Sequence, residues 1–427
     1  MLKGLNNVSV GGGYRELDAI ELKRKIHQTI RTFPWYETAM KQHGCLKAGE
    51  EVLTLSDLPL MTAEWLEKHY YTPHQPLSRH PGLRCYRTSG TSSGLRKAIY
   101  YSEEDELAYA RIKSRIFGRF LGGSSVRTAL SDMGTGHAAD TAPEIFARIG
   151  LQAEAISFRL PVEMHLERLL SMRPHVLYTM PSILDSLLQA ADDPTRFGIR
   201  KVILVGEAAA PSWIARSAER LGIRTTDVMD TYGSIEIGTI AYFSHEHGRY
   251  LIAEGLEAEG VRDIPMPSRG NAAALDEDES VLVLTATVRE MFPAMRYVTY
   301  DVVRDFRPIL VDGVWRQSFQ ALVRRLGPEL KHGEKISVFD IEEVVFRHIG
   351  QTIVRVEVAD NRLRIHIGGE NPGEEKLRAI SQDLQDRIPE IGRMVRNRLL
   401  EELQVLRLEE GASLEGSSIK HKKIYYN

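Results

Sequence analysis

The sequence contains little cysteine, no long apolar run and no excess of one charge. Only Cys45 and Cys85 occur among 427 residues, and their wide separation fits neither a disulfide framework nor a zinc site. No apolar stretch reaches the ~18 residues of a membrane span, and the first residues lack the apolar core of a secretion signal. We therefore expect a protein of the reducing cytoplasm with no membrane partner.

The charge balance and the length of the chain further limit the class of protein and its number of domains. A formal net charge of −3 provides no basic field for a polyanion, so we expect no nucleic-acid partner. The chain is too long for one core of ordinary size, and two or three domains are expected.

Short apolar runs alternate with helical patterns between about residues 126 and 250. This rhythm predicts an α/β fold with mostly parallel sheets, in which ligands bind beyond the carboxyl ends of the strands. The expected strands are 126–130, 153–157, 176–178, 202–205 and 225–230, and the expected helices are 140–149, 162–172, 181–192 and 211–221.

The flanking regions differ in character. Residues 16–44 have helical spacing, and Thr62 is expected to cap a further helix. Residues 250–325 change to antiparallel patterns, and the strands 280–285 and 314–319 are expected in a barrel-like part. Together with the parallel sheets they would complete a large, multi-subdomain N-terminal domain over residues 1–325.

A small α+β domain is expected over residues 334–427. Its predicted elements are a helix at 338–348, strands at 352–358 and 362–367, and a helix at 374–395. The join, residues 326–333, contains a proline and two glycines and is interpreted as a hinge that makes the small domain mobile, with an ordinary linker as the alternative.

One loop is unusually rich in hydroxyls, glycine and cations. Residues 88–97 read TSGTSSGLRK between two predicted strands, 83–87 and 98–101. Glycine allows a close backbone approach, hydroxyls donate hydrogen bonds and cations neutralise charge, so the loop is suited to phosphate. It is not a Walker A loop, which would lead directly into a helix; a surface turn is the alternative. Ser102 and Asp105 are then expected to open a helix as a capping box.

The order of several motifs resembles that of the adenylate-forming superfamily, which comprises acyl-CoA synthetases, adenylation domains and luciferases. Segments 33–36, 58–62 and 288–297 are most similar to its phenylacetate-CoA ligase-like branch. The motifs that carry the resemblance are the loop at 88–97, Val205–Ala208, Asp230–Glu236, Met295–Asp301 and the lysines near the end.

The resemblance implies a nucleotide site for ATP and Mg²⁺. Asp301 would accept both ribose hydroxyls, and Glu236 would help to hold Mg²⁺. The loop would contact the β- and γ-phosphates through Thr88, Ser89, Gly90, Thr91, Ser92 and either Arg96 or Lys97. Adenine would be flanked by Gly206, Glu207, Ala208, Asp230, Thr231, Tyr232 and Gly233.

The resemblance also implies an acid pocket at strand ends. Its candidate residues are His137, Tyr178, Met180 and Ser182, although such side chains often serve packing alone. An aromatic acid is favoured by analogy with the branch. Arg296 is open to two interpretations, a ligand contact or a salt-bridge partner in the core.

The small domain carries two further matches. Residues 332–337 resemble the turn that follows the family's hinge, and Arg324 could fill the hinge arginine position. Lys420, within residues 417–423, resembles the lysine that meets the α-phosphate and the carboxylate, with a solvated basic tail as the alternative.

The function that these features imply is ATP-dependent activation of a carboxylic acid to an acyl adenylate with release of pyrophosphate. Rotation of the small domain would then allow transfer to coenzyme A or to the phosphopantetheine of a carrier protein. Arg96, Glu236 and Lys420 would be the catalytic residues. The alternatives are a degenerate relative acting as a nucleotide or acyl sensor or scaffold, and a phosphotransferase that releases ADP.

Overall fold

A computed structural model describes most of the chain. The described residues are 17–45, 54–72, 75–87, 97–123, 125–133, 137–207, 209–265, 275–326, 338–349, 352, 354–359, 362–368, 372–388, 391–392, 395, 402–407 and 424–426. The predicted phosphate-loop residues Thr88, Ser89, Gly90, Thr91, Ser92 and Arg96, together with Ala208, the post-hinge turn and Lys420, lie outside them.

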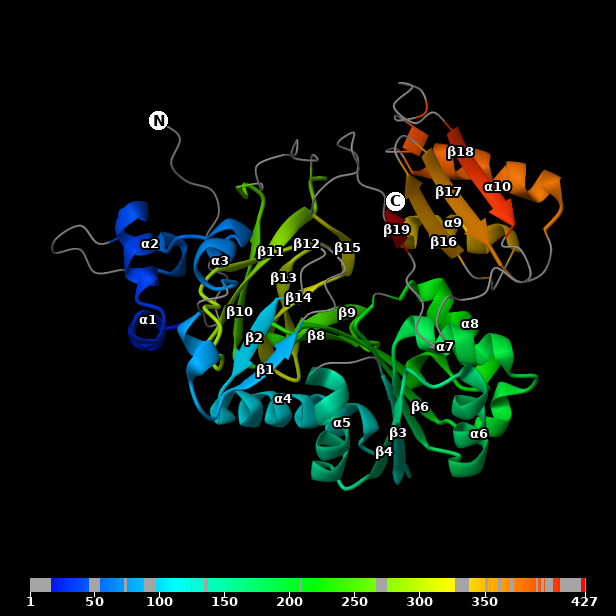
Figure 1. The fold of residues 1–427 in the computed structure, drawn as a ribbon, viewed down its shortest axis with the longest axis horizontal. Coiled ribbons are helices and arrows are strands. Elements are labelled where there is room, and N and C mark those ends of the chain that lie inside the picture. Colours follow the sequence, from blue (N-terminus) through cyan, green and yellow to red (C-terminus); the bar gives the residue numbers. More distant parts are fainter. Residues whose placement is uncertain are drawn as a thin grey trace.

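The N-terminal region is helical, as predicted. Helices α1 (Ala19–Thr32), α2 (Trp35–His43) and α3 (Ala63–His69) pack beside a four-stranded sheet at one end of the molecule (Figure 1). The Asp18 carboxylate caps α1 by accepting from the backbone N–H groups of Ile20 and Glu21.

A nine-stranded mixed sheet forms the centre of the larger part, in the order β13-β14-β9-β8-β7-β6-β5-β3-β4. The parallel half of this sheet confirms the predicted alternation of strands and helices. Helices α4 and α5 lie on one side of it, and α6, α7 and α8 lie on the other side, at the right of Figure 1. The bounds are β3 (Thr128–Met133), α5 (His137–Arg148), β4 (Gln152–Ser157), α6 (Val162–Met172), β5 (Val176–Thr179), α7 (Pro181–Ala190), β6 (Lys201–Val205), α8 (Pro211–Leu221) and β7 (Val228–Ser234).

The predicted strand at 225–230 begins later than expected. Thr225–Asp227 form a 3₁₀ turn, in which Asp227 accepts hydrogen bonds from the backbone N–H and the guanidinium of Arg224. A carboxylate that caps a turn in this way competes with an extended backbone, so β7 starts only at Val228.

Antiparallel strands complete two sheets. Strands β8 (Gly238–Ser244), β9 (Arg249–Ile252), β13 (Arg307–Val311) and β14 (Val314–Phe319) extend the nine-stranded sheet, and β10 (Leu256–Val261), β11 (Glu279–Ala286), β12 (Tyr297–Arg304) and β15 (Ala321–Arg325) form a separate sheet. The strand predicted at 314–319 therefore exists but does not share a sheet with residues 280–285. It pairs with β9 instead, where the Phe319 ring stacks on Tyr250 at 5.0 Å.

The two strands predicted around the phosphate loop are present. Strands β1 (Arg84–Arg87) and β2 (Ala98–Tyr101) pair antiparallel, and α4 (Glu103–Leu121) follows. The expected capping box opens this helix, since Ser102 and Asp105 exchange side-chain to backbone hydrogen bonds.

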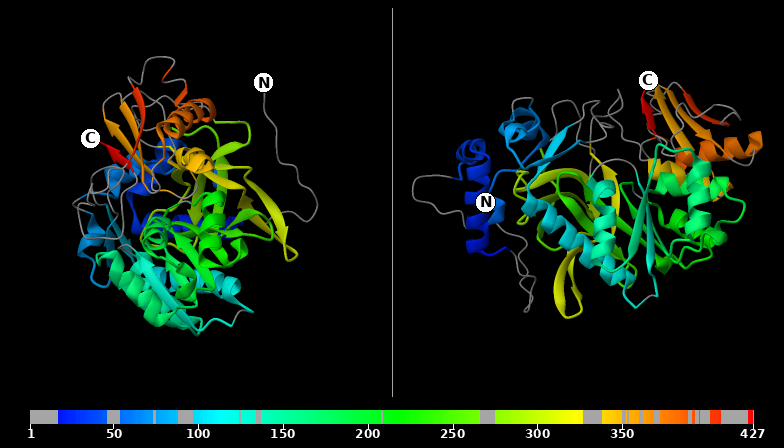
Figure 2. Two further views of the ribbon diagram at one scale, coloured as in Figure 1. Left: turned by 90° about the vertical axis from the view of Figure 1, so that its right-hand side faces the viewer. Right: turned by 60° about the horizontal axis from the view of Figure 1, so that its bottom comes forward.

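The C-terminal part forms its own four-stranded sheet, which is flanked by helices. Strands β16 (Val354–Ala359), β17 (Arg362–Ile367), β18 (Glu402–Arg407) and β19 (Ile424–Tyr426) lie beside α9 (Val338–Ile349) and α10 (Glu374–Arg387). Helix α10 ends at Arg387, earlier than the predicted residue 395. This part sits against α7 and α8 (Figures 1 and 2), where the Arg216 guanidinium lies 4.3 Å from the Phe346 ring centroid. Within the described residues, no helix combines the length and apolar character needed to cross a bilayer.

Candidate active site

The carboxyl ends of β5 and β6 bring together four residues that were predicted separately. The Glu207 carboxylate accepts hydrogen bonds from the Ser182 backbone N–H and hydroxyl, both at 2.8 Å. Ser182 belongs to the first turn of α7, where the helix dipole favours a negative charge. Gly206 has φ +81°, and a β-carbon there would lie 3.1 Å from the Met180 methyl group. Glycine at this position therefore lets the two strand ends approach each other.

The turn after β7 depends on a second glycine. A β-carbon on Gly233 would lie only 2.5 Å from the backbone oxygen of Gly238, closer than two unbonded atoms can approach. Strands β7 and β8 pair antiparallel here, with a register shift between Tyr232 and Gly233. The glycine thus permits the tight turn that presents Glu236 at the end of the sheet.

Asp301 is held by side chains from two other strands. Tyr232 donates its hydroxyl hydrogen to one carboxylate oxygen, and the Arg325 Nε lies 3.8 Å from the other. Burial raises the pKa of Asp301, and the charge of Arg325 and the hydrogen bond from Tyr232 oppose that rise. Tyr300, the residue before it, has φ +62° where the pairing of β11 with β12 is irregular. Such an irregularity bends the strand locally.

Arg325 was missed by the sequence reasoning, which singled out Arg324. The Arg324 side chain lies outside the described residues, whereas Arg325 is the register partner of Asp301 across β12 and β15. Two adjacent arginines cannot be distinguished without the strand register, because neighbouring residues of a strand face opposite sides.

Glu236 and Lys97 come from different segments, and both contact Tyr71. Tyr71 directs its hydroxyl toward Glu236 Oε1 at 3.5 Å, and the Lys97 ammonium lies 4.5 Å from the Tyr71 ring centroid. The buried Tyr297 is electrostatically coupled to both Glu236 and Asp301. The structure thus gathers parts of three predicted motifs around a small group of tyrosines.

A magnesium ion would fit this arrangement. Within the described residues, no three His, Cys, Asp or Glu side chains cluster as a complete metal site. Mg²⁺ in nucleotide sites commonly uses one or two carboxylates and takes its other ligands from phosphates and water. The half-buried Glu236 carboxylate, with one long hydrogen bond, has the acceptor capacity for that role.

Asp230 and Thr231 direct their side chains into the protein. The Thr231 hydroxyl donates to the Leu204 carbonyl at 2.6 Å, and the Tyr250 hydroxyl donates to Asp230. Burial raises the pKa of Asp230 to about 7, although the hydrogen bond from Tyr250 favours ionisation. Any contact of these two residues with adenine would therefore come from their backbone.

The two interpretations of Arg296 are resolved by its partners. Its guanidinium makes two hydrogen bonds to the Glu259 carboxylate, at 3.0 and 2.9 Å, and two more to the carbonyls of Ser56 and Leu58. All of these partners belong to the protein. Arg296 is a salt-bridge residue that ties the segment around Leu58 to the four-stranded sheet.

His137 occupies an aromatic enclosure at the start of α5. Its Nε2 lies 2.7 Å from the Glu106 carboxylate, and its ring packs against Tyr86, Tyr101 and Tyr109 with centroid distances of 4.5, 4.2 and 3.9 Å. Burial lowers the pKa of His137, although Glu106 acts in the opposite direction. The imidazole is therefore held in a fixed orientation.

Sequence reasoning missed two buried cations near these residues. Arg289 donates to the Glu236 carbonyl at 3.0 Å, pairs with Asp105 and covers the Tyr101 ring. Lys113 donates to the hydroxyls of Tyr109 and of Tyr178, each at 2.6 Å. The helical spacing of residues 109, 113 and 117, two aromatics around a lysine, could have indicated that Lys113 faces the core.

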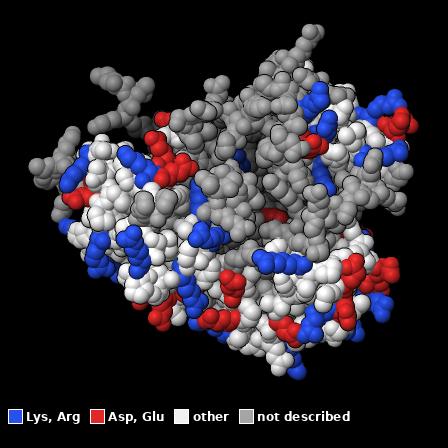
Figure 3. Space-filling model, in the orientation of Figure 1, with Lys and Arg blue, Asp and Glu red and all other residues white. Residues whose placement is uncertain are grey.

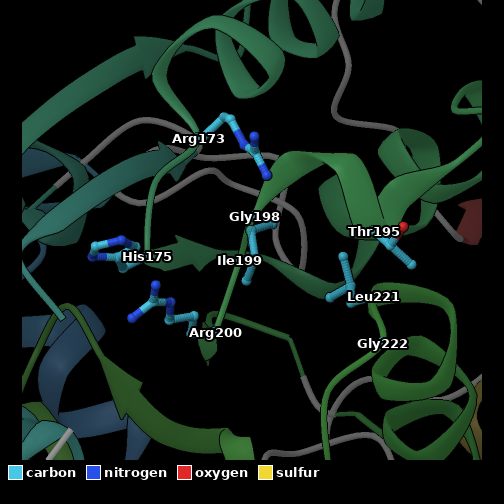
Figure 4. A pocket seen from close by; sticks show the side chains of 8 residues that line it. All are labelled: Arg173, His175, Thr195, Gly198, Ile199, Arg200, Leu221 and Gly222. Carbon is cyan, nitrogen blue, oxygen red and sulfur yellow. The ribbon is translucent and has the colours of Figure 1, made fainter. Parts of the chain in front are cut away.

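Besides this site, the protein has surface charges of both signs and a further pocket. Lysine, arginine and acidic side chains are interspersed on the face seen in Figure 3. A pocket at the opposite, amino-terminal end of β5 and β6 is lined by Arg173, His175, Thr195, Gly198, Ile199, Arg200, Leu221 and Gly222 (Figure 4). Its lining contains none of the predicted site residues.

Comparison with known proteins places these features in context. The family model described as the fumarate–diaminopropanoate ligase C-terminal domain matches residues 331–409. The chain is 35% identical over 388 residues, 90% of its length and 94% of the relative, to fumarate–(S)-2,3-diaminopropanoate ligase of Enterobacter agglomerans.

Solved structures share the fold at low sequence identity. A 2-hydroxyisobutyryl-CoA ligase bound to an acyl adenylate in the postadenylation state has a TM-score of 0.70 at 15% identity, covering 99% of this chain and 94% of that one. An ATP-bound RpMatB–BxBclM chimera has a TM-score of 0.51 at 13% identity, covering 78% and 65%. The mixed α/β fold with its separate C-terminal part is therefore shared with these proteins.

Proposed function

Because this chain belongs to the adenylate-forming superfamily of ligases and activates an acid with ATP, we propose that its acid is a dicarboxylate such as fumarate and its acceptor an amine. The observation that carries the proposal is the similarity, over nine-tenths of the chain, to a ligase named for fumarate and (S)-2,3-diaminopropanoate. That name describes an acid joined to an amino acid.

The match of the C-terminal family model supports the amine acceptor. In the superfamily resemblance, the small domain rotates for the second half-reaction, so that domain contributes to the site where the acceptor binds. Residues 331–409 match the family model described as the fumarate–diaminopropanoate ligase C-terminal domain. Coenzyme A or a carrier-protein thiol is the alternative acceptor, and an aromatic acid is the alternative substrate.

The proposed reaction has two balanced steps. A carboxylate oxygen of the acid attacks the α-phosphorus of ATP, the bond to the β-phosphate oxygen breaks, and pyrophosphate leaves. The amine nitrogen then attacks the acyl carbon, a C–N bond forms, the bond to the AMP oxygen breaks, and the nitrogen loses a proton to solvent. The products are an amide, AMP and pyrophosphate.

The proposed roles follow from the chemistry of each side chain. Asp301, oriented by Tyr232 and Arg325, would accept the ribose hydroxyls, and Glu236 would hold Mg²⁺, which neutralises phosphate charge when bound. Gly206 and Glu207 would lie beside the adenine. Arg96 or Lys97 and the loop hydroxyls would contact the terminal phosphates, and Lys420 the α-phosphate.

Pyrophosphate exchange across a panel of acids tests the first step. The purified protein is incubated with MgATP, labelled pyrophosphate and fumarate, succinate, crotonate or benzoate, and exchange into ATP is expected to be fastest with a dicarboxylate. Exchange with benzoate alone would overturn the dicarboxylate, and tight ATP binding without exchange for any acid would favour the sensor alternative.

Product analysis tests the second step. With fumarate and MgATP, adding (S)-2,3-diaminopropanoate is expected to release AMP stoichiometrically with an amide, identified by its mass. A thioester formed with coenzyme A, and no amide with the amine, would overturn the proposed acceptor. Release of ADP would point to phosphoryl transfer instead.

A further inference from the structure

Lys113 is a buried cation that lacks a counter-charge in the described part of the protein. Only 2% of the residue is exposed, and its ammonium lies among the rings of Tyr109, Phe117 and Tyr178 at 4.9, 5.6 and 5.0 Å from their centroids. Its two hydrogen-bond partners are phenol oxygens. A buried ammonium is costly unless it is paired, so this arrangement needs an explanation.

The other buried basic side chains of the described residues are neutralised. Arg249, Arg289, Arg296, His137 and His165 each face a carboxylate, and Lys25 bonds to a carbonyl and to Gln28 with Asp105 and Glu290 nearby. Lys113 therefore differs from them, because no carboxylate of the described residues neutralises its charge. A tyrosine hydroxyl that accepts from Lys113 can itself donate onward, so the cluster retains the capacity to bind one anion.

The cluster adjoins the proposed acid pocket. Tyr178 lies near the carboxyl end of β5, and the Tyr109 ring packs on His137 at 3.9 Å. Tyr109 also lines a narrow cavity with Tyr101, Ile112, Ile237 and Thr239, and it fits against Gly238, where a β-carbon would lie 2.9 Å from its ring. Lys113 thus stands behind two residues predicted to contact the acid.

We propose that Lys113, held by Tyr109 and Tyr178, binds the non-reacting carboxylate of the acid substrate and so selects a dicarboxylate. This inference rests on the proposed function and assigns its selectivity to one side chain. The first carboxylate must reach the α-phosphate, and the second would enter an apolar enclosure where only a cation can compensate for its lost hydration. Burial lowers the pKa of Lys113 to about 7 in the free protein, and a bound carboxylate would raise it again.

The test compares fumarate with crotonate, in which a methyl group replaces the second carboxylate. In the wild-type protein, kcat/KM for pyrophosphate exchange is expected to favour fumarate by about 100-fold or more. Lys113→Met should lower the value for fumarate by about 100-fold and change the value for crotonate less than about threefold. Retained crotonate activity would show that the variant is folded and binds ATP.

Lys201→Met is the matched control. Lys201 also contacts an aromatic ring, that of Phe120 at 4.8 Å, but it pairs with Asp227 at the amino-terminal end of β6. This variant should keep the preference for fumarate. A Lys113→Met variant that also keeps the preference would overturn the inference while leaving acid activation intact, whereas exchange with neither acid in the wild-type protein would overturn the proposed function.

A pH profile of the wild-type protein provides a second readout if the Lys113→Met variant does not fold. Deprotonation of Lys113 above about pH 7 should lower kcat/KM for fumarate and not for crotonate. The other titratable groups around it are Tyr109, Tyr178, Tyr101 and His137 with Glu106 behind it. Burial raises the pKa values of the three tyrosines and lowers that of His137, so none of these should lose a proton in that range. Parallel profiles for the two acids would overturn the inference.

Discussion

Arg325 and Asp301 are partners in the register of β15 and β12, and Arg325 Nε lies 3.8 Å from Asp301 Oδ1. Arg325 begins the connection to the C-terminal part, since the next described element is α9. The carboxylate proposed to bind ribose therefore pairs with the last residue of β15, the strand that precedes the C-terminal part.

Replacing Asp301 should weaken nucleotide binding. Asp301→Asn keeps the shape of the side chain but removes the charge and one acceptor for the ribose hydroxyls, and a hydrogen bond to a charged group contributes about 1.5–3 kcal/mol. We expect KM for ATP to rise about 10–100-fold in pyrophosphate exchange. Asp312→Asn, on the exposed β13–β14 hairpin beside Arg119, is the control. An unchanged KM for ATP in Asp301→Asn would contradict the role in ribose binding.

Replacing Glu207 should lower both stability and nucleotide affinity. Glu207→Ala removes the acceptor of two hydrogen bonds at the first turn of α7, and the cost should be about 1–3 kcal/mol. Chemical denaturation measures the stability loss, and the KM for ATP measures the binding loss. Ser182→Ala should lose about 1 kcal/mol of stability, since one backbone N–H still reaches Glu207. Equal ATP affinity in the wild type and in Glu207→Ala would exclude Glu207 from the adenine site.

Gly233→Ala should strongly impair acid activation. The added methyl group would lie 2.5 Å from the Gly238 oxygen, so the β7–β8 turn would have to open and move Glu236. We expect pyrophosphate exchange to fall by at least about 100-fold, because a displacement of about 1 Å at a reacting site has that effect. Gly373→Ala, at a position where an added methyl group meets nothing within 4 Å and φ is −61°, is the control. Full activity of Gly233→Ala would mean that the turn is not required.

Asp230 should make folding stability depend on pH. Its pKa is about 7 in the folded protein, raised by burial, and about 3.9 in an unfolded chain. The folded state therefore binds the proton more tightly, and stability should fall as the pH rises from about 4 to 7. Asp230→Asn should remove this component and be more stable than the wild type at pH 8 by about 1–3 kcal/mol. Denaturation curves at pH 5 and pH 8 measure the free energy of unfolding of each protein. If that free energy changes between the two pH values by the same amount in the wild type and in Asp230→Asn, the prediction is contradicted.

The alternation of strands and helices between residues 126 and 250 could be read from the sequence because it follows from local periodicity. The capping box at Ser102 could also be read, because Ser102 and Asp105 are three residues apart. Motif order was sufficient to indicate an adenylate-forming enzyme, since each motif is a continuous stretch of sequence. The motifs by themselves favoured an aromatic acid and a thiol acceptor, whereas the proposed dicarboxylate and amine come from the similarity to a ligase named for fumarate and (S)-2,3-diaminopropanoate.

Tertiary structure decided the contacts between distant side chains. Lys113 and Tyr178 are 65 residues apart, and Tyr232 and Asp301 are 69 residues apart. Hydrophobic periodicity indicates which face of an element is buried, but not which residue of another element will meet it. The sequence determined the parallel core and the order of the motifs because both depend on local backbone preferences. The pairing of β14 with β9, the choice of Arg325 and the enclosure of Lys113 were decided by strand register and packing, which exist only once the chain is folded.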